Sequence, residues 1–440
     1  MSDGHPAETQ PHRTRAFVAA WLGWCFDGLD GYLYIMVAMR LVRQLLEADS
    51  GGVPVSTAEV ISKSAIIQAG FLVGWAVGGA FFGRIGDRIG RATTLTLTVL
   101  TYAVFTGASY FAAEWWHLLL FRFIAALGIG GEWAAGSALV SEMLHERHRW
   151  WASATLQSGY MVGCIAASFT AAALRDFDPR TVFIVGVLPA LFTVWIRWAV
   201  PEPKGWTQAR REQAMPPLRA LFGPGLLGTT IATTLLTSIT LTTVWAFLFF
   251  GPALIQRLPD LRASRTPEEI QAYASWVSIL YLCVNIGANF FATYLARCIG
   301  YRAAFAILIF GALCVTSLVF GQGVLGFGFT LNEQSVPWLY SLIAFFGLGL
   351  FGIFPLYIPP LFPTLLRTLG AGFSYNVGRL VSAVGAIVGG QIAAGQGQAG
   401  AIGLDAAIFW TGLLYIPGLV VCLFIREIPR GTESNVAPQE

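Results

Sequence analysis

The 440-residue sequence has little charge for its length. Only 12% of its residues are Asp, Glu, Lys or Arg, whereas 55% are hydrophobic and the mean hydropathy is +0.64. An ordinary globular protein carries roughly 25% charged residues, which form its water-facing shell. No stretch of this sequence is long and polar enough to make a separate soluble domain. These absences argue against a soluble protein and favour a chain that lies in a bilayer.

The sequence also lacks the motifs of several chemistries. The 6 cysteines lie singly in apolar stretches, without CxxC pairs or the spacing of metal ligands. There is no GxxxxGK[ST] phosphate loop and no HExxH motif, and the 5 histidines lie in the N-terminal tail or at the ends of apolar stretches. We therefore expect no enzyme, no cofactor, no metal and no nucleic-acid partner, but a monomeric protein in contact with lipid.

Apolar runs of the length needed to cross a bilayer recur from end to end. A spanning helix needs about 20 residues. Hydropathy predicts an all-α membrane protein with twelve spans, near 16–39, 64–83, 93–112, 117–141, 151–173, 181–200, 222–250, 273–296, 303–322, 336–360, 371–394 and 405–425. The polar start of the chain is interpreted as a tail and not as a signal peptide, because no short apolar core with a cleavage site follows it.

The distribution of charge predicts the orientation. An even number of spans puts both termini on one side, and most of the 27 Arg and Lys residues fall on that side. The positive-inside rule therefore predicts cytoplasmic termini. The expected organisation is a tail at 1–15, a six-helix half at 16–200, a charged, Pro-containing cytoplasmic linker at 201–221, a second six-helix half at 222–425, and a tail at 426–440.

A glycine- and arginine-rich turn follows the second span. It reads Gly83-Arg84-Ile85-Gly86-Asp87-Arg88-Ile89-Gly90-Arg91, and the turn after the eighth span, 292–302, is a degraded copy without the aspartate. The glycines allow a tight helix-loop-helix, and Asp87 and the arginines can pair across two halves. We expect Glu142, at the end of the fourth span, to pair with these arginines. The alternative is a merely solvated basic loop.

This turn resembles the signature loop of the major facilitator superfamily. Arg122, the run Gly128-Ile129-Gly130-Gly131-Glu132-Trp133 and the pair Ser141-Glu142 resemble the fourth-helix motif of its proton symporters. The segment 361–379, which contains Arg367, resembles the junction of spans ten and eleven in the sialate:proton symporters and related carboxylate permeases. The resemblance implies two six-helix repeats, alternating access, gating by the turn and by Arg367, and symport of a proton with a small organic acid in a bacterial inner membrane.

Five ionisable groups fall within predicted spans: Asp27, Asp30, Arg122, Glu132 and Arg379. A charge at mid-bilayer costs about 2.5–3.5 kcal/mol on insertion scales, so such groups usually face a cavity and have a function. The first two lie three residues apart on one helical face, about 15 Å deep, with Tyr34 a turn further along.

Two desolvated carboxyl groups repel each other, which favours a proton on at least one of them. We expect proton coupling at Asp27 or Asp30; the alternative is that one pairs with an arginine of another helix and only holds the fold. Glu132 is either a proton relay or a packing residue beside its glycines. Arg122 either draws anions into the cavity or pairs with a carboxylate.

Arg379 lies about mid-depth in span eleven, with Tyr375 and Asn376 on its face. A guanidinium matches two carboxylate oxygens at once. We therefore expect Arg379, Asn376, Tyr375, Tyr34 and Arg122 to bind the substrate. The alternative is an Arg379–carboxylate pair that locks the halves together.

The leading hypothesis is inward symport of a small organic anion, either a monocarboxylate or a sialate-like acid, with protons. A sugar or neutral-solute facilitator, or a proton-coupled efflux carrier, are the alternatives on the same fold.

Overall fold

The computed structural model describes residues 10–144, 148–394 and 403–428, and within these ranges the chain is helical with no strand. The first part of the chain forms α1 (Gln10–Asp49), α2 (Thr57–Ile89), α3 (Arg91–Ser109), α4 (Trp115–Met143), α5 (Arg149–Ala173), η2 (Pro179–Thr181), α6 (Val182–Val185), α7 (Leu188–Ala199), α8 (Lys204–Glu212) and η3 (Leu218–Phe222).

The second part continues with α9 (Leu227–Ile255), α10 (Pro259–Ser264), α11 (Pro267–Ile299), α12 (Tyr301–Phe320), α13 (Gln322–Leu325), α14 (Val336–Ile343), η4 (Ala344–Leu348), η5 (Gly349–Gly352), α15 (Phe354–Tyr357), η6 (Pro359–Leu361), η7 (Thr364–Leu366), α16 (Arg367–Asn376), α17 (Gly378–Ala394), α18 (Leu404–Gly412) and α19 (Tyr415–Val421).

Six helices in the described part of the chain are long and apolar enough to cross a membrane. They are the segments Thr57–Ile89, Trp115–Met143, Leu227–Pro252, Pro267–Ile299, Tyr301–Phe320 and Val336–Tyr357. Several of these helices begin at residues that favour a helix N-terminus. At α11, for example, Thr266 and Glu269 form a capping box around Pro267. The number of spans and the side on which the termini lie stay predictions.

Four of the predicted spans contain a local irregularity of the helix. Span 181–200 is divided into α6 and α7, and span 405–425 into α18 and α19. In both cases a proline, Pro189 or Pro417, lies early in the second piece. Proline has no N–H to donate and its ring clashes with the carbonyl four residues earlier, which lies at or next to the end of each first piece.

The two other irregularities lie in spans ten and eleven. Span 336–360 changes from α14 to a π-helical turn (η4), a 3₁₀ turn (η5) and α15, where Pro355 removes a backbone donor. Span 371–394 has an irregular turn at Val377, between α16 and α17, where the backbone stays helical and the Val377 N–H donates to the Phe373 carbonyl at 3.1 Å. Directly after that turn, Gly378 lies so close to the backbone of Ser238 in α9 that any Cβ would overlap it.

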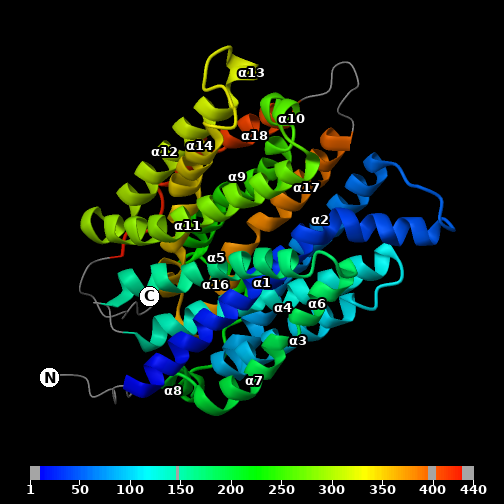
Figure 1. Cartoon of the computed structure of the whole chain (residues 1–440). Helices are drawn as coiled ribbons and strands as arrows, with labels where there is room; N and C mark the ends of the chain where they lie inside the picture. The colour runs from blue at the N-terminus through cyan, green and yellow to red at the C-terminus, as the bar shows by residue number, and fades with distance from the viewer. Residues whose placement is uncertain (1–9, 145–147, 395–402, 429–440) are drawn as a thin grey trace.

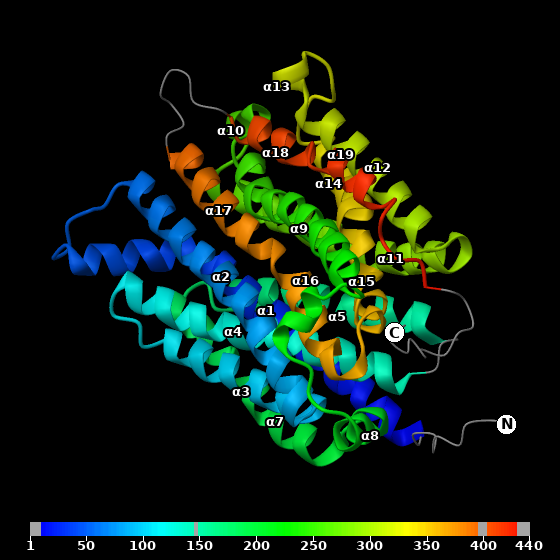
Figure 2. The same ribbon diagram turned by 180° about the vertical axis from the view of Figure 1, so that it is seen from behind.

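The helices form two bundles (Figure 1). In the first, α2 and α3 pack on α4, and α1 packs on α5; in the second, α9 packs on α17, α18 and α19, and α12 packs on α18 and α19. The bundles meet where α2 contacts α16 and α17 and where α5 contacts α11. Seen from behind, α8 lies beneath the first bundle, next to α7 and the start of α1 (Figure 2).

Two of the predicted boundaries differ in the structure. The helix α1 begins at Gln10, so the last six residues of the expected tail 1–15 are helical. The stretch 201–221 contains α8 and most of η3. Residues 1–9 and 429–440 of the predicted tails lie outside the described residues.

Candidate functional site: buried charges between two helical bundles

Asp30 and Arg122 form a fully buried ion pair between α1 and α4. Arg122 Nη1 donates to both carboxylate oxygens, at 2.8 and 2.9 Å, and Nη2 donates to the Asp30 backbone carbonyl at 3.1 Å. Thr106 on α3 donates its hydroxyl to the same carboxylate. Arg122 is 0% exposed, and its guanidinium lies 4.7 Å from the Phe71 ring centre. We call Asp30, Thr106 and Arg122 the paired cluster.

Tyr34 belongs with this cluster. Its ring centre lies 5.8 Å from the Arg122 guanidinium carbon, and its hydroxyl donates to the Ser64 carbonyl of α2 at 3.1 Å. Tyr34 and Arg122, both expected to bind substrate, are therefore in contact with each other and are held by protein neighbours in this structure.

Asp27 lies three residues before Asp30 but has a different neighbour. Its carboxyl group faces that of Glu132 on α4. Apart from each other, both oxygens of Asp27 and Oε2 of Glu132 are buried without a hydrogen-bond partner among the described residues. The Glu132 carboxyl group packs directly on Gly23, where a Cβ would overlap it. Gly23, a turn before Asp27, thus makes room for the second carboxyl group.

Arg379 is the third unpaired group. It is only 2% exposed, and no ion pair among the described residues includes it. Its Nη1 donates to the Asn376 side-chain oxygen, and Asn376 in turn donates to the Gly372 carbonyl at 2.8 Å. The Asp27 carboxyl group lies within the range of electrostatic interaction with the Arg379 guanidinium. We call Asp27, Glu132 and Arg379 the open cluster.

Aromatic faces enclose the Arg379 guanidinium. Its central carbon lies 4.0 Å from the ring centre of Trp75 and 4.9 Å from that of Tyr375. Tyr375 also stacks on Trp133, with ring centres 3.7 Å apart and planes at 11°. Trp245 of the second bundle meets Trp75 edge-on at 6.0 Å. Cation–π contacts of this kind hold a guanidinium without neutralising its charge.

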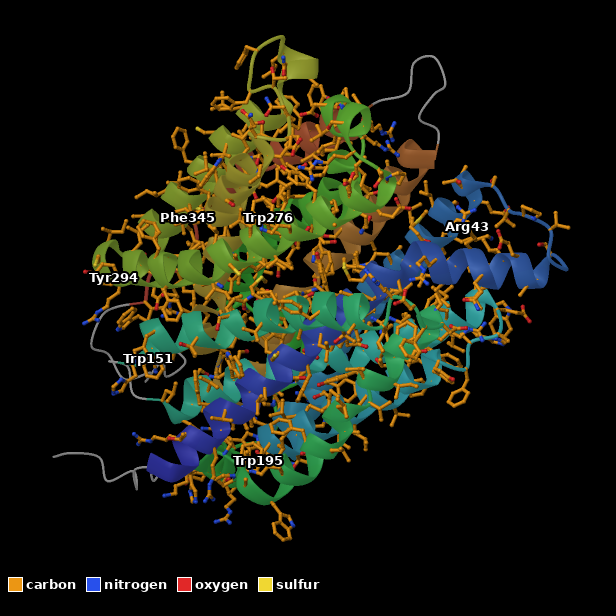
Figure 3. The ribbon with its side chains drawn as sticks, in the orientation of Figure 1. Arg43, Trp151, Trp195, Trp276, Tyr294 and Phe345 are labelled. Atoms are coloured by element: carbon orange, nitrogen blue, oxygen red, sulfur yellow. The ribbon has the colours of Figure 1, made fainter. Side chains whose placement is uncertain are left out.

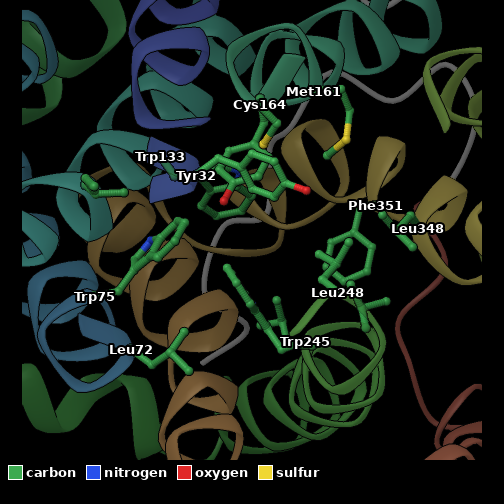
Figure 4. Close-up of a cluster of buried hydrophobic side chains, with 14 of the residues drawn as sticks. Tyr32, Leu72, Trp75, Trp133, Met161, Cys164, Trp245, Leu248, Leu348 and Phe351 are labelled. Atoms are coloured by element: carbon green, nitrogen blue, oxygen red, sulfur yellow. The ribbon is translucent and has the colours of Figure 1, made fainter. Parts of the chain in front are cut away.

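Figure 4 shows Trp75, Trp133 and Trp245 directed toward one region between the bundles, together with Tyr32 of α1. Of these, Trp75, Trp133 and Tyr32 were not among the predicted site residues, because an aromatic residue in an apolar span looks like any lipid-facing or core residue. No sequence signal distinguishes them.

The residues of the predicted signature loop, 83–91, connect the two bundles at one end. Gly83 and Gly86 pack on Thr368 and Leu369 so closely that a Cβ would lie at or below 3.0 Å from them. Asp87 accepts hydrogen bonds from the backbone N–H groups of these same two residues, at 3.2 and 3.0 Å.

Ion pairs reinforce this end. Arg91 Nη2 and Arg367 Nη1 each lie 3.0 Å from Glu142 Oε1, so one carboxylate bridges the two bundles. Arg91 also donates to the Thr364 carbonyl at 2.6 Å. Arg88 points to the surface. The structure is therefore closed at the loop end.

A carboxylate cap of a helix start next to the loop was not predicted from the sequence. Glu202, just after α7, accepts three backbone N–H bonds from the start of α3, at 2.6 to 3.2 Å, and one from the Thr93 hydroxyl. Gly90, with φ of 111°, allows this approach, since a Cβ would overlap the carboxyl group. Glu427 caps α12 in the same way beside Gly300, whose φ is 91°.

Two bundles of membrane helices, with buried charges within the first and a buried arginine from the second, are typical of a transport protein, and the comparisons with known proteins agree. The family model described as Major Facilitator Superfamily matches residues 20–358. The chain belongs to this superfamily of secondary transporters.

Relatives and solved structures cover almost the whole chain. A probable 4-methylmuconolactone transporter of Cupriavidus pinatubonensis is 28% identical over 92% of this chain and 91% of its own length. The sialic acid transporter NanX of Escherichia coli is 29% identical, covering 84% of this chain and 85% of its own. The fold matches the proton:xylose symporter XylE, with a TM-score of 0.74, 14% identity and coverage of 94% and 96%.

Proposed function

We propose that this protein is a proton-coupled symporter that moves a small organic anion inward by alternating access. In this proposal twelve spans form two six-helix halves, 16–200 and 222–425, joined by the linker 201–221. The protein acts as a monomer in a bacterial inner membrane with both termini in the cytoplasm. Relatives named for 4-methylmuconolactone, cis,cis-muconate, sialic acid and niacin transport support an organic acid as cargo.

The observation that carries the proposal is the state of Arg379. A buried guanidinium without a carboxylate partner is costly, and the cost is recovered when an anion arrives. The fork of Arg379 can take two carboxylate oxygens, while Asn376 fixes its orientation. The faces of Trp75 and Tyr375 next to the guanidinium suit a flat, unsaturated acid better than a polyhydroxylated one, because a planar π-system stacks on aromatic rings.

Proton coupling follows from the open cluster as a whole. A positive charge nearby stabilises the ionised form of a carboxyl group, and Arg379 is the positive charge of this cluster. When a substrate carboxylate neutralises Arg379, that stabilisation is lost, and Asp27 and Glu132 take up a proton more readily. Substrate and proton therefore favour each other's binding, which is the thermodynamic requirement for symport.

The paired cluster has a different role in the proposal. Asp30 and Arg122 satisfy each other, so we assign them to holding α1 against α4 and not to proton or substrate binding. The contacts of Asp87 and Glu142 close the loop end, which we take as the cytoplasmic gate. Opening toward the cytoplasm then requires breaking the bridge from Glu142 to Arg367.

Uptake into proteoliposomes tests the proposal. The purified protein is reconstituted and given benzoate, nicotinate, cis,cis-muconate, lactate, sialate and xylose with and without an inward proton gradient. We expect accumulation of at least one flat acid that depends on the gradient and is abolished by a protonophore. Uptake of xylose that ignores the gradient would favour a facilitator, and drug resistance of expressing cells without acid uptake would favour an efflux carrier.

A further inference from the structure

A cavity of about 270 Å³ lies at the loop end of the first bundle, away from the open cluster. The start of α1, the start of α3 and the end of α7 enclose it. Its lining includes His12 and Arg15 of α1, Thr93 of α3, and Trp198 and Glu202 at and beyond the end of α7. None of the roles proposed above for transport uses this cavity.

The charge available in the cavity is positive. Arg15 is exposed and His12 is half-buried, so both side chains can turn toward a ligand. Glu202 is the acidic residue of the lining, but three backbone N–H groups and the Thr93 hydroxyl already occupy its oxygens. A guanidinium and an imidazole remain, and both can donate to phosphate oxygens.

The rim of the cavity has the character of a membrane interface. Trp198 is 92% exposed and lies one residue before α7 ends at Ala199. Trp195, a turn earlier and 36% exposed, stacks with Phe192 at 5.0 Å. Figure 3 shows Trp195 on the outer side of the first bundle, near α7. Exposed tryptophans at the end of a membrane helix lie at the depth of the lipid headgroups.

We propose that this cavity binds the headgroup of an anionic phospholipid. The phosphate accepts hydrogen bonds from Arg15 and His12, the indole of Trp198 lies against the glycerol region, and the acyl chains run along the aromatic face of α7. Basic groups beside an interfacial tryptophan and an apolar helix match a phospholipid, because they meet its charge and its hydrocarbon at once. The lipid then ties α1, α3 and α7 together at the loop end.

The test measures how lipid changes the thermal unfolding of the full-length protein in detergent. Phosphatidylglycerol, phosphatidylcholine and soluble glycerol phosphate are added in turn to the unaltered protein, to Arg15→Gln and to Arg210→Gln. The last variant is the matched control, because Arg210 is an exposed arginine on α8 at the same end and outside the cavity lining. We expect phosphatidylglycerol to raise the unfolding temperature of the unaltered protein and of Arg210→Gln, and Arg15→Gln to lose most of that rise.

A second readout does not depend on stability. Brominated phosphatidylglycerol should quench the tryptophan fluorescence more than brominated phosphatidylcholine does, and Trp198→Phe should remove that difference. The proposal is overturned if both arginine variants respond to phosphatidylglycerol alike, or if Trp198→Phe leaves the difference intact. A full response to glycerol phosphate alone would assign the cavity to a free phosphate compound and would also overturn it.

Discussion

The paired and the open cluster both combine a buried arginine with one or more buried carboxyl groups, but these charges form an ion pair only in the paired cluster. Both hold an arginine and at least one acidic residue, both are buried, and both draw on α1 and α4. In the paired cluster, the carboxylate of Asp30 receives Arg122 and Thr106. In the open cluster, Asp27 faces Glu132 while Arg379 has no carboxylate within ion-pair distance in the described chain.

The difference indicates what each cluster is for. A buried, hydrogen-bonded charge pair is stable only as a unit, since removing one partner leaves an uncompensated charge. An unpaired buried charge destabilises the fold at all times. It is therefore retained where a ligand or a proton neutralises it during function. The first arrangement suits a structural connection, and the second suits a site that is alternately filled and emptied.

The largest expected effect comes from breaking the paired cluster. Arg122→Met leaves Asp30 charged and buried, which should destabilise the fold by about 3–5 kcal/mol. Size-exclusion chromatography and thermal unfolding of the purified protein should then show little folded material. The double variant Asp30→Leu with Arg122→Met removes both charges and should recover much of the loss. If Arg122→Met folds as well as the unaltered protein, the cluster is not structural.

A second prediction concerns the carboxyl groups of the open cluster. Asp27→Asn and Glu132→Gln should fold normally, because each amide resembles the protonated acid in shape. They should lose accumulation driven by a proton gradient while keeping substrate counterflow, since exchange needs no net proton movement. Glu268→Gln, at the exposed start of α11, is the control and should keep both activities. Unchanged gradient-driven accumulation in both variants would remove these residues from coupling.

The smallest effect sharpens the comparison within the paired cluster. Thr106→Val keeps the shape of the side chain but removes its hydrogen bond to Asp30, which should cost about 1.5–3 kcal/mol, as for other bonds to charged groups. Thr101→Val on the same helix is the control. It removes only a hydrogen bond within that helix, which Thr101 Oγ1 donates to the Leu97 carbonyl at 2.7 Å. Thermal unfolding should therefore separate the two variants. Equal shifts would mean that Asp30 does not depend on Thr106.

The sequence alone could predict that the buried charges are important, but not which of them pair with each other and which stay unpaired. Asp27 and Asp30 share a helical face, and helical spacing cannot tell which of them meets Arg122 and which meets Glu132, because both partners lie on another helix. One available signal was missed. Gly23, four residues before Asp27, marks a close approach to α1, and the structure fills that space with Glu132.

The fold shows the same limit. Hydropathy locates apolar segments well, yet it does not register where a helix breaks inside one. Pro189 and Pro417 were visible signals for the breaks in spans six and twelve. The irregular turn at Val377 has no proline, and it lies next to Gly378, whose close contact with α9 is a tertiary feature. The caps by Glu202 and Glu427 are likewise formed between segments about 110 to 126 residues apart.

Binding of a carboxylate to Arg379 tests the central claim most directly. Isothermal titration of the purified protein with the acid that is best transported compares the unaltered protein with Arg379→Lys and Arg297→Lys. Arg297 is a matched control, since its guanidinium also lies on an aromatic face, 5.6 Å from the Trp150 ring centre, but at the surface. A lysine cannot reproduce the two-pronged contact, so Arg379→Lys should bind about 10- to 100-fold more weakly, equivalent to about 1.5–3 kcal/mol, while Arg297→Lys binds normally. Equal affinity in all three proteins would contradict the account.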